Sequence, residues 1–171
     1  MGQDTYCVMG ASVPVAFTYK NWPIYRDLLF NSSLDETELS MLLLTEFPSD
    51  GCHNLTYHIG EAFRDFDSPD KPITPKEFQA CVASLAADIR KYKWLPETKE
   101  LLGMELQIMV EITYCHVRGL TRRDNPHIFN QEISHSPASI AAKTREAYEN
   151  LTKVGIPEGR ISINHYIWDS Q

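Results

Sequence analysis

The chain has 171 residues, of which 43% are hydrophobic and 23% are charged. This length favours one domain with a core of its own, and the composition excludes an intrinsically disordered chain. The longest unbroken aliphatic run covers residues 41–44, which is far too short to span a membrane.

The net charge of −7 is unevenly distributed along the chain. Residues 1–85 contain five basic and twelve acidic residues, whereas residues 86–171 contain eleven of each. An acidic half repels the nucleic-acid backbone and attracts basic protein surfaces. We therefore expect a protein partner with a basic surface and no direct binding to nucleic acid.

The cysteines and the N-terminal residues indicate a reducing compartment. The four cysteines include no C-x-x-C pair, and the first residues lack the basic and apolar regions of a secretion signal. We expect a cytoplasmic protein with free thiols that does not enter a membrane.

The first two predicted elements are a strand and a short helix. Residues 5–19 are rich in Val, Thr and aromatics, which predicts a strand to about Ser12. A bulge or an edge continuation should follow, because Pro14 cannot donate a hydrogen bond. Residues 21–30 predict a short helix that begins near Pro23.

The next region is predicted to be helix, then strand, then loop. Ser33 and Glu36 match a capping box, and the apolar residues after them predict a helix that ends near Phe47. Residues 55–59 predict a short strand. Residues 61–70 are acidic and end in turn-forming residues, which predicts a loop.

The clearest predicted helix begins after Thr74. Pro75 suits the first helical position, and Glu77 is placed to bond back to the Thr74 cap. Apolar residues then repeat at helical spacing: Phe78, Cys81, Val82, Leu85, Ile89 and Tyr92. Pro96 interrupts this pattern, and Gly103 ends it.

A regular strand, a long loop, a helix and a final strand complete the chain. Residues 105–115 alternate apolar and polar side chains, which predicts a strand with one wet face. Residues 116–135 show no periodicity and predict a long loop. Ser136 caps a helix that ends at Gly155, and residues 161–167 alternate as a strand.

This order of elements predicts a single α+β domain over residues 1–171. Its core is a mixed, mostly antiparallel sheet of three to five strands, with helices mainly on one face. The sequence contains no P-loop, dinucleotide-binding, zincin, nucleophile-elbow or EF-hand motif, which weakens the case for those classes.

The predicted long loop carries a basic cluster in an otherwise acidic protein. Its members are His116, Arg118, Arg122, Arg123, His127 and His135. Guanidinium groups match phosphate and carboxylate geometry, so this cluster is a candidate site for a phosphorylated small molecule or an acidic patch of a partner. Alternatively, the arginines pair with the protein's own carboxylates.

The acidic half supplies a predicted partner-binding face. Its residues are Asp35, Glu36, Glu38, Glu61, Asp65, Asp67 and Asp70. Asp65 and Asp67 also match the D-x-D pattern of divalent-cation sites, although a solvated turn has the same composition. Cysteine–histidine dipeptides begin at Cys52 and Cys115, but burial of cysteine explains them more simply than zinc. We predict neither a metal nor a cofactor.

Aromatic residues are abundant at both ends of the chain. Trp22, Tyr25 and Phe30 cluster near the start, and Tyr166 and Trp168 lie in the last predicted strand. Exposed rings of this kind mark contact surfaces, whereas buried ones belong to the core.

These features favour a small acidic binding protein that acts by occluding a partner protein's site, as inhibitor, immunity or anti-defence proteins do. One alternative is an enzyme or sensor for a phosphorylated small molecule, with a histidine of the basic cluster as general base. A second alternative is a self-associating structural component, most simply a homodimer. No catalytic residue is predicted.

Overall fold

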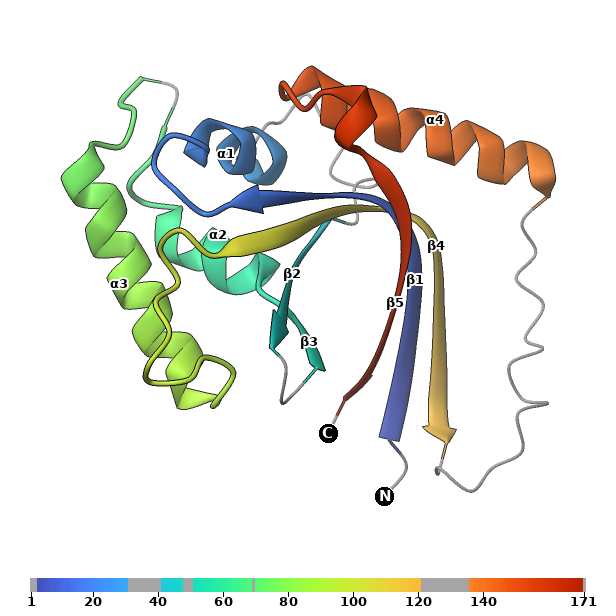
Figure 1. Ribbon diagram of the computed structural model, residues 1–171, viewed down its shortest axis with the longest axis horizontal. Coiled ribbons are helices and arrows are strands. Elements are labelled where there is room, and N and C mark those ends of the chain that lie inside the picture. Colours follow the sequence, from blue (N-terminus) through green and yellow to red (C-terminus); the bar gives the residue numbers. More distant parts are fainter. Residues whose placement is uncertain (1–2, 31–40, 48–50, 69, 121–135, 171) are drawn as a thin grey trace. The chain divides into compact units, whose positions relative to one another are not determined.

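The computed structural model describes residues 3–30, 41–47, 51–68, 70–120 and 136–170, and it describes side chains for 8–30, 55–68, 70–113 and 136–165. Figure 1 shows the elements in chain order. They are β1 (Gln3–Ala16), α1 (Trp22–Phe30), β2 (Met41–Phe47), β3 (Gly51–Asn54), α2 (Thr56–Phe63), α3 (Pro75–Lys91), β4 (Glu105–Leu120), α4 (Pro137–Lys153), the 3-10 helix η2 (Glu158–Arg160) and β5 (Ser162–Ser170).

The strands form one sheet in the order β3-β2-β4-β1-β5. β1 pairs antiparallel with β5, from Asp4 opposite Ser170 to Ser12 opposite Ser162. β2 pairs antiparallel with β3. The predicted α+β class and its mostly antiparallel sheet are therefore confirmed, and the five strands fall within the predicted number.

The chain divides into two compact units, of which one comprises Met1–Ser12 and Val110–Gln171 and the other Val13–Met109. Strands β1 and β4 each run through both units. Because continuous strands join the units, this division does not test the prediction of a single domain.

β1 continues past the proline that was expected to disturb it. Pairing with β5 ends at Ser12, so Pro14 lies beyond the last β5 partner and has no hydrogen bond to donate on that side. Further along, the Phe17 N–H donates to the Met104 carbonyl at 2.8 Å, and the Gly103 N–H donates to the Phe17 carbonyl at 2.8 Å. Of the two predicted outcomes, the structure has the edge continuation.

Aromatic rings fill the core of the unit formed by residues 13–109. Phe17, Trp22, Tyr25, Phe63 and Phe78 are all almost fully buried. The Trp22 and Phe63 rings stack with their centroids 4.0 Å apart. The Tyr25 hydroxyl donates to the Val15 carbonyl at 2.5 Å, and burial raises the pKa of this phenol well above its usual range. Trp22 and Tyr25 of the aromatic cluster near the start of the chain thus belong to the core, whereas Phe30 is 38% exposed.

Both predicted caps of the two longest helices are confirmed. At α3 the Glu77 N–H donates to the Thr74 hydroxyl at 3.2 Å, and the Thr74 N–H donates to the Glu77 carboxylate at 2.9 Å. At α4 the Ser139 N–H donates to the Ser136 hydroxyl at 3.1 Å. Gly155 has a φ of 93° just after α4, as its predicted role at the helix end requires.

In the other unit, polar and apolar contacts hold β5 in place. Ala147 and Leu151 of α4 are buried, and the Tyr148 hydroxyl donates to the Ile161 carbonyl at 3.4 Å. The side-chain amide of Asn164 in β5 donates to the buried Ser12 hydroxyl of β1 at 2.5 Å.

Two predictions for the region before α3 are wrong. The predicted helix ending near Phe47 is strand β2 over 41–47, and the predicted strand over 55–59 belongs to helix α2. α2 also includes the beginning of the predicted loop over 61–70. Short apolar runs do not distinguish a buried strand from a helix. Here the antiparallel pairing of β2 with β3 decides the outcome.

The long loop predicted over 116–135 does not include its first five residues. β4 extends to Leu120, so residues 116–120 are strand and that part of the prediction is wrong. Residues 121–135 lie outside the described part of the chain.

Candidate protein-binding surface

The connection between α2 and α3, residues 64–73, is held against the aromatic core by one carboxylate. We call it the acidic loop; residue 69 is not described. The Trp22 indole N–H donates to the Asp67 carboxylate at 2.5 Å. The other Asp67 oxygen accepts from the Ile73 N–H at 3.4 Å. One side chain thus links the loop to α1 and to the approach to α3.

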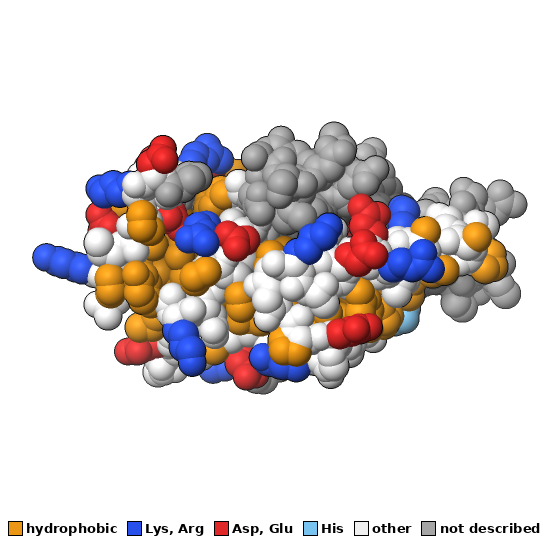
Figure 2. Space-filling model, turned by 90° about the horizontal axis from the view of Figure 1, so that it is seen from above, with side chains coloured by type: hydrophobic (Ala, Val, Ile, Leu, Met, Phe, Trp, Pro, Cys, Tyr) orange, Lys and Arg blue, Asp and Glu red, His pale blue; other side chains and the backbone are white. Residues whose placement is uncertain are grey.

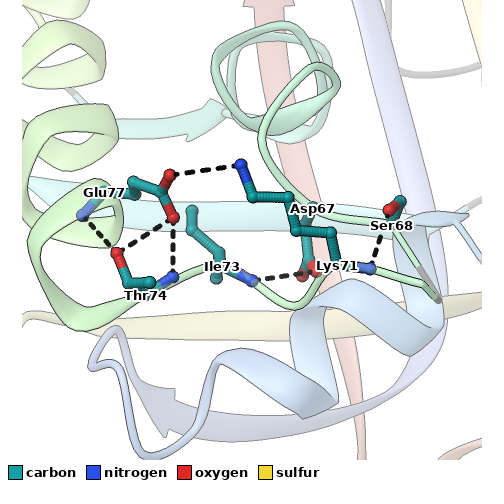
Figure 3. Close-up of polar contacts among 6 residues, drawn as sticks. All are labelled: Asp67, Ser68, Lys71, Ile73, Thr74 and Glu77. Carbon is teal, nitrogen blue, oxygen red and sulfur yellow. Dashed lines mark hydrogen bonds and ion pairs between the residues drawn. The ribbon is translucent and has the colours of Figure 1, made fainter.

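The second half of the acidic loop is fixed by a turn and by the α3 cap (Figure 3). Ser68 and Lys71 exchange backbone hydrogen bonds of 3.1 and 3.3 Å, and the Lys71 N–H also reaches the Ser68 hydroxyl. The Lys71 ammonium lies 3.8 Å from the Glu77 carboxylate. Hydrogen bonds from the Thr74 backbone and hydroxyl lower the pKa of Glu77, and Lys71 adds to this effect.

The acidic loop carries one exposed aromatic ring and several exposed charged side chains. Phe66 is 47% exposed. Asp65 and Asp70 are exposed, and so is Glu61 in the last turn of α2, which forms an ion pair with Arg64. An exposed aromatic ring with a charged rim on a fixed backbone is the arrangement of an interface anchor.

The structure divides the predicted acidic face into different roles. Glu61, Asp65 and Asp70 lie together on or beside the acidic loop, whereas Asp67 is taken up by its contacts to Trp22 and Ile73. The remaining predicted members, Asp35, Glu36 and Glu38, lie outside the described residues. Phe66 was missed as a site residue because its acidic neighbours indicated a solvated turn.

The predicted basic cluster cannot be assembled from the described residues. His116 and Arg118 are in β4, beyond the part of that strand whose side chains are described. Arg122, Arg123, His127 and His135 fall within residues 121–135, outside the described residues. Binding of a phosphorylated ligand by this cluster therefore stays a prediction. The homodimer also stays a prediction, because nothing in the described residues tests it.

Charges of both signs are mixed on the face of the protein drawn in Figure 2. Neighbouring residues form ion pairs: Arg26–Asp27, Glu61–Arg64, Lys71–Glu77 and Asp88–Lys91. Exposed pairs of this kind contribute little to stability but weaken the local field. Two of these pairs involve Arg64 and Lys71 of the acidic loop itself, so any attraction of this loop for a basic partner depends on Asp65 and Asp70 rather than on the net charge of the chain.

The described residues contain no group of three His, Cys, Asp or Glu side chains that could hold a metal ion. Cys81 in α3 is a buried free thiol, and burial raises its pKa. None of the helices in the described ranges has the length and apolar character needed to cross a membrane.

We compared the chain with known protein families, curated proteins and solved structures. The chain matches no family model, no curated protein and no solved structure.

Proposed function

We propose that this chain is a binding protein that occludes a site on a partner protein, with the acidic loop as its contact surface. The observation that carries the proposal is the exposed Phe66 ring on a loop that Asp67 links to the core, with Asp65 and Asp70 exposed on the same loop. The partner surface that fits this arrangement has an apolar pocket surrounded by Lys and Arg side chains.

The fixed backbone of the loop supports a role in binding. Association loses less conformational entropy when the contact residues are already held in place. The indole bond to Asp67 and the capping box at Thr74 provide that order in the unbound protein. Complete burial of an exposed phenylalanine contributes about 1.5–3 kcal/mol, and Phe66, which is 47% exposed, would gain about half of this on binding.

The carboxylates of the acidic loop would make binding selective and raise the association rate. Opposite charges across an interface raise the association rate and reject like-charged surfaces. A protein that covers the partner's site in this way needs no catalytic group of its own. Inhibition should then follow simple stoichiometry, with one bound chain blocking one site.

The proposal can be tested by comparing capture of proteins from the native host with matched variants of the full chain. Phe66→Ala and the double variant Asp65→Lys/Asp70→Lys should each weaken capture of the same protein by at least about tenfold. The purified partner should lose its own activity or ligand binding when the wild-type chain is added. Its affinity for the chain should fall as salt rises.

Two control variants change the same properties elsewhere in the same unit. Leu102→Ala removes another exposed apolar side chain, and Glu97→Lys/Glu100→Lys makes the same change in net charge at exposed positions. If these controls weaken capture as much as the loop variants, or if the partner keeps its activity when bound, the proposal is wrong.

A further inference from the structure

Four aromatic rings gather at the end of the α2–α3 pair that lies opposite the acidic loop. Tyr57 and His58 come from the first turn of α2, and Tyr92 and Trp94 follow α3. Tyr92 and Trp94 stack with their centroids 5.0 Å apart, and the His58 ring lies 5.5 and 5.4 Å from them. We call these four residues the aromatic platform.

Much of the platform faces solvent. Tyr57 is 71% exposed and Tyr92 is 56% exposed, while Trp94 and His58 are partly exposed. The Tyr57 and His58 rings meet edge to face at 5.7 Å. Stacked rings of this kind normally belong to a core, as Trp22 and Phe63 do. Here two of the rings, Tyr57 and Tyr92, are largely exposed instead.

A strained residue at the end of α3 creates the stack. Lys93 has a φ of 60°, a left-handed conformation in which glycine is favoured. The Lys93 N–H donates to the Arg90 carbonyl at 2.9 Å, and the Trp94 N–H donates to the Ile89 carbonyl at 3.3 Å. This reversal of the chain returns the Trp94 ring to Tyr92. Strain held in a non-glycine residue is characteristic of functional segments.

The lysine at the strained position also adds charge to the platform. Residues 88–94 contain Arg90, Lys91 and Lys93 but only one acidic residue, Asp88, which bonds Lys91 at 2.7 Å. The segment is locally basic although the whole chain is acidic. At physiological salt, charges beyond about 8 Å are largely screened, so these nearby cations dominate at a bound ligand.

We propose that the aromatic platform binds single-stranded nucleic acid. Bases would stack on the exposed rings of Tyr57 and Tyr92, with Trp94 stacked against Tyr92 to hold it in place, and phosphates would lie beside Lys91 and Lys93. Alternating cations and aromatic rings, as in Arg90 to Trp94, supply the two contacts that single strands require. Base stacking is tolerant of sequence, so little sequence preference is expected.

Other ligand classes fit the platform less well. A double helix hides the base faces that the rings would contact. An acidic peptide would pair with the lysines but leave the aromatic rings uncovered. An uncharged sugar would cover the aromatic rings but leave the lysines without a partner of opposite charge. The net charge of −7 argued against nucleic acid, but it describes the whole chain rather than this segment. We expect the affinity to be modest and strongly dependent on salt.

The test is fluorescence anisotropy of labelled oligothymidylate and oligouridylate of about ten nucleotides, within the usual site size of single-strand binders. The full chain should bind both strands, and Tyr92→Ala or Trp94→Ala should weaken binding at least about tenfold. Trp94→Phe keeps a stacking face and should retain most of the affinity. Lys91→Ala/Lys93→Ala should weaken binding and reduce its dependence on salt.

Matched controls separate the platform from general effects. Lys20→Ala/Lys76→Ala removes two exposed lysines elsewhere in the same unit, and Leu102→Ala removes an exposed apolar side chain; neither should alter binding. Circular dichroism establishes that each variant is folded. The proposal is overturned if the wild-type chain fails to bind at low salt, or if Trp94→Ala binds as tightly as wild type. Equal binding of a duplex, or full competition by polyglutamate, overturns it too. None of these outcomes bears on capture of a protein partner by the acidic loop.

Discussion

The two ends of the α2–α3 pair use the same residue types in opposite ways. At the acidic loop, Trp22 and Phe63 stack in the core, and a carboxylate binds the indole N–H. At the aromatic platform, Tyr92 and Trp94 stack in contact with solvent, with lysines around them. Ring stacking therefore does not by itself indicate a core, and the polar partners of each ring show whether it serves packing or contact.

The ends also differ in local charge, although both belong to an acidic chain. The acidic loop contains Asp65, Asp67 and Asp70 with Arg64 and Lys71, whereas the segment beside the platform contains Arg90, Lys91 and Lys93 with Asp88. A net charge of −7 describes neither end. Screening makes each surface respond mainly to the groups within about 8 Å, so one small unit can carry surfaces of different local charge.

The largest effect is expected when the carboxylate that holds the acidic loop in place is removed. Asp67→Ala leaves the Trp22 indole N–H without its acceptor, and we expect a loss of about 1–3 kcal/mol in the free energy of unfolding. Urea titration measures this loss, and hydrogen exchange should show faster exchange of the loop amides. Asp65→Ala removes an exposed carboxylate and should change stability by less than about 0.5 kcal/mol. Equal effects of the two variants would show that Asp67 does not anchor the loop.

A smaller effect is expected at the helix cap that ends the acidic loop. Thr74→Ala removes the hydroxyl that accepts from the Glu77 N–H, which should cost about 1 kcal/mol in urea unfolding. Ser84→Ala, at an exposed position inside α3, is a suitable control. The interpretation fails if the control loses as much stability as the cap variant.

The same cap should make stability depend on pH in the acid range. Hydrogen bonds from Thr74 lower the pKa of Glu77 in the folded protein below its ordinary value of 4.5. The carboxylate then stabilises the fold fully above that value, and this contribution disappears as the pH falls through the lowered pKa. The stability difference between wild type and Glu77→Gln should therefore be largest near neutral pH and narrow below about pH 4.5. If the stability difference between wild type and Glu77→Gln did not change with pH, the pKa of Glu77 would not be lowered by folding.

The sequence predicted the elements whose signals are local. The caps at Thr74 and Ser136, the strand from Glu105 and the glycine after α4 each depend on a few neighbouring residues, and all are confirmed, although Met109 on the predicted wet face of that strand is buried. The fold class followed from their order. β2 and α2 were assigned wrongly because their short apolar runs satisfy both periodicities. Pairing between strands, which no local pattern encodes, decides such cases.

The candidate site was predictable only in part for the same reason. Acidic residues at 61–70 were found from charge alone, but the inward role of Asp67 depends on Trp22, 45 residues away in the sequence. The aromatic platform also combines residues from two helices. Its sequence signal was the interleaving of cations and rings from Arg90 to Trp94, which is visible without a structure once net charge is set aside.

The smallest effect, and the most informative about the platform, concerns the left-handed residue at its centre. Lys93→Gly relieves the steric clash of a side chain at a φ of 60°, and we expect a gain of about 0.5–1 kcal/mol in unfolding free energy. Lys93→Ala removes the same charge but keeps the steric clash, so the unfolding free energy of this variant should not exceed that of wild type. Equal stability of the two variants would mean that the position is not strained.

Comparing these two variants in oligonucleotide binding separates backbone strain from charge. Both lack the ammonium group, so both should bind more weakly than wild type if the lysine contacts phosphate. If only the glycine variant binds weakly, the rigid left-handed turn that positions Trp94 is the important feature. A stability gain combined with weaker binding in Lys93→Gly is therefore the result that ties this strain to function.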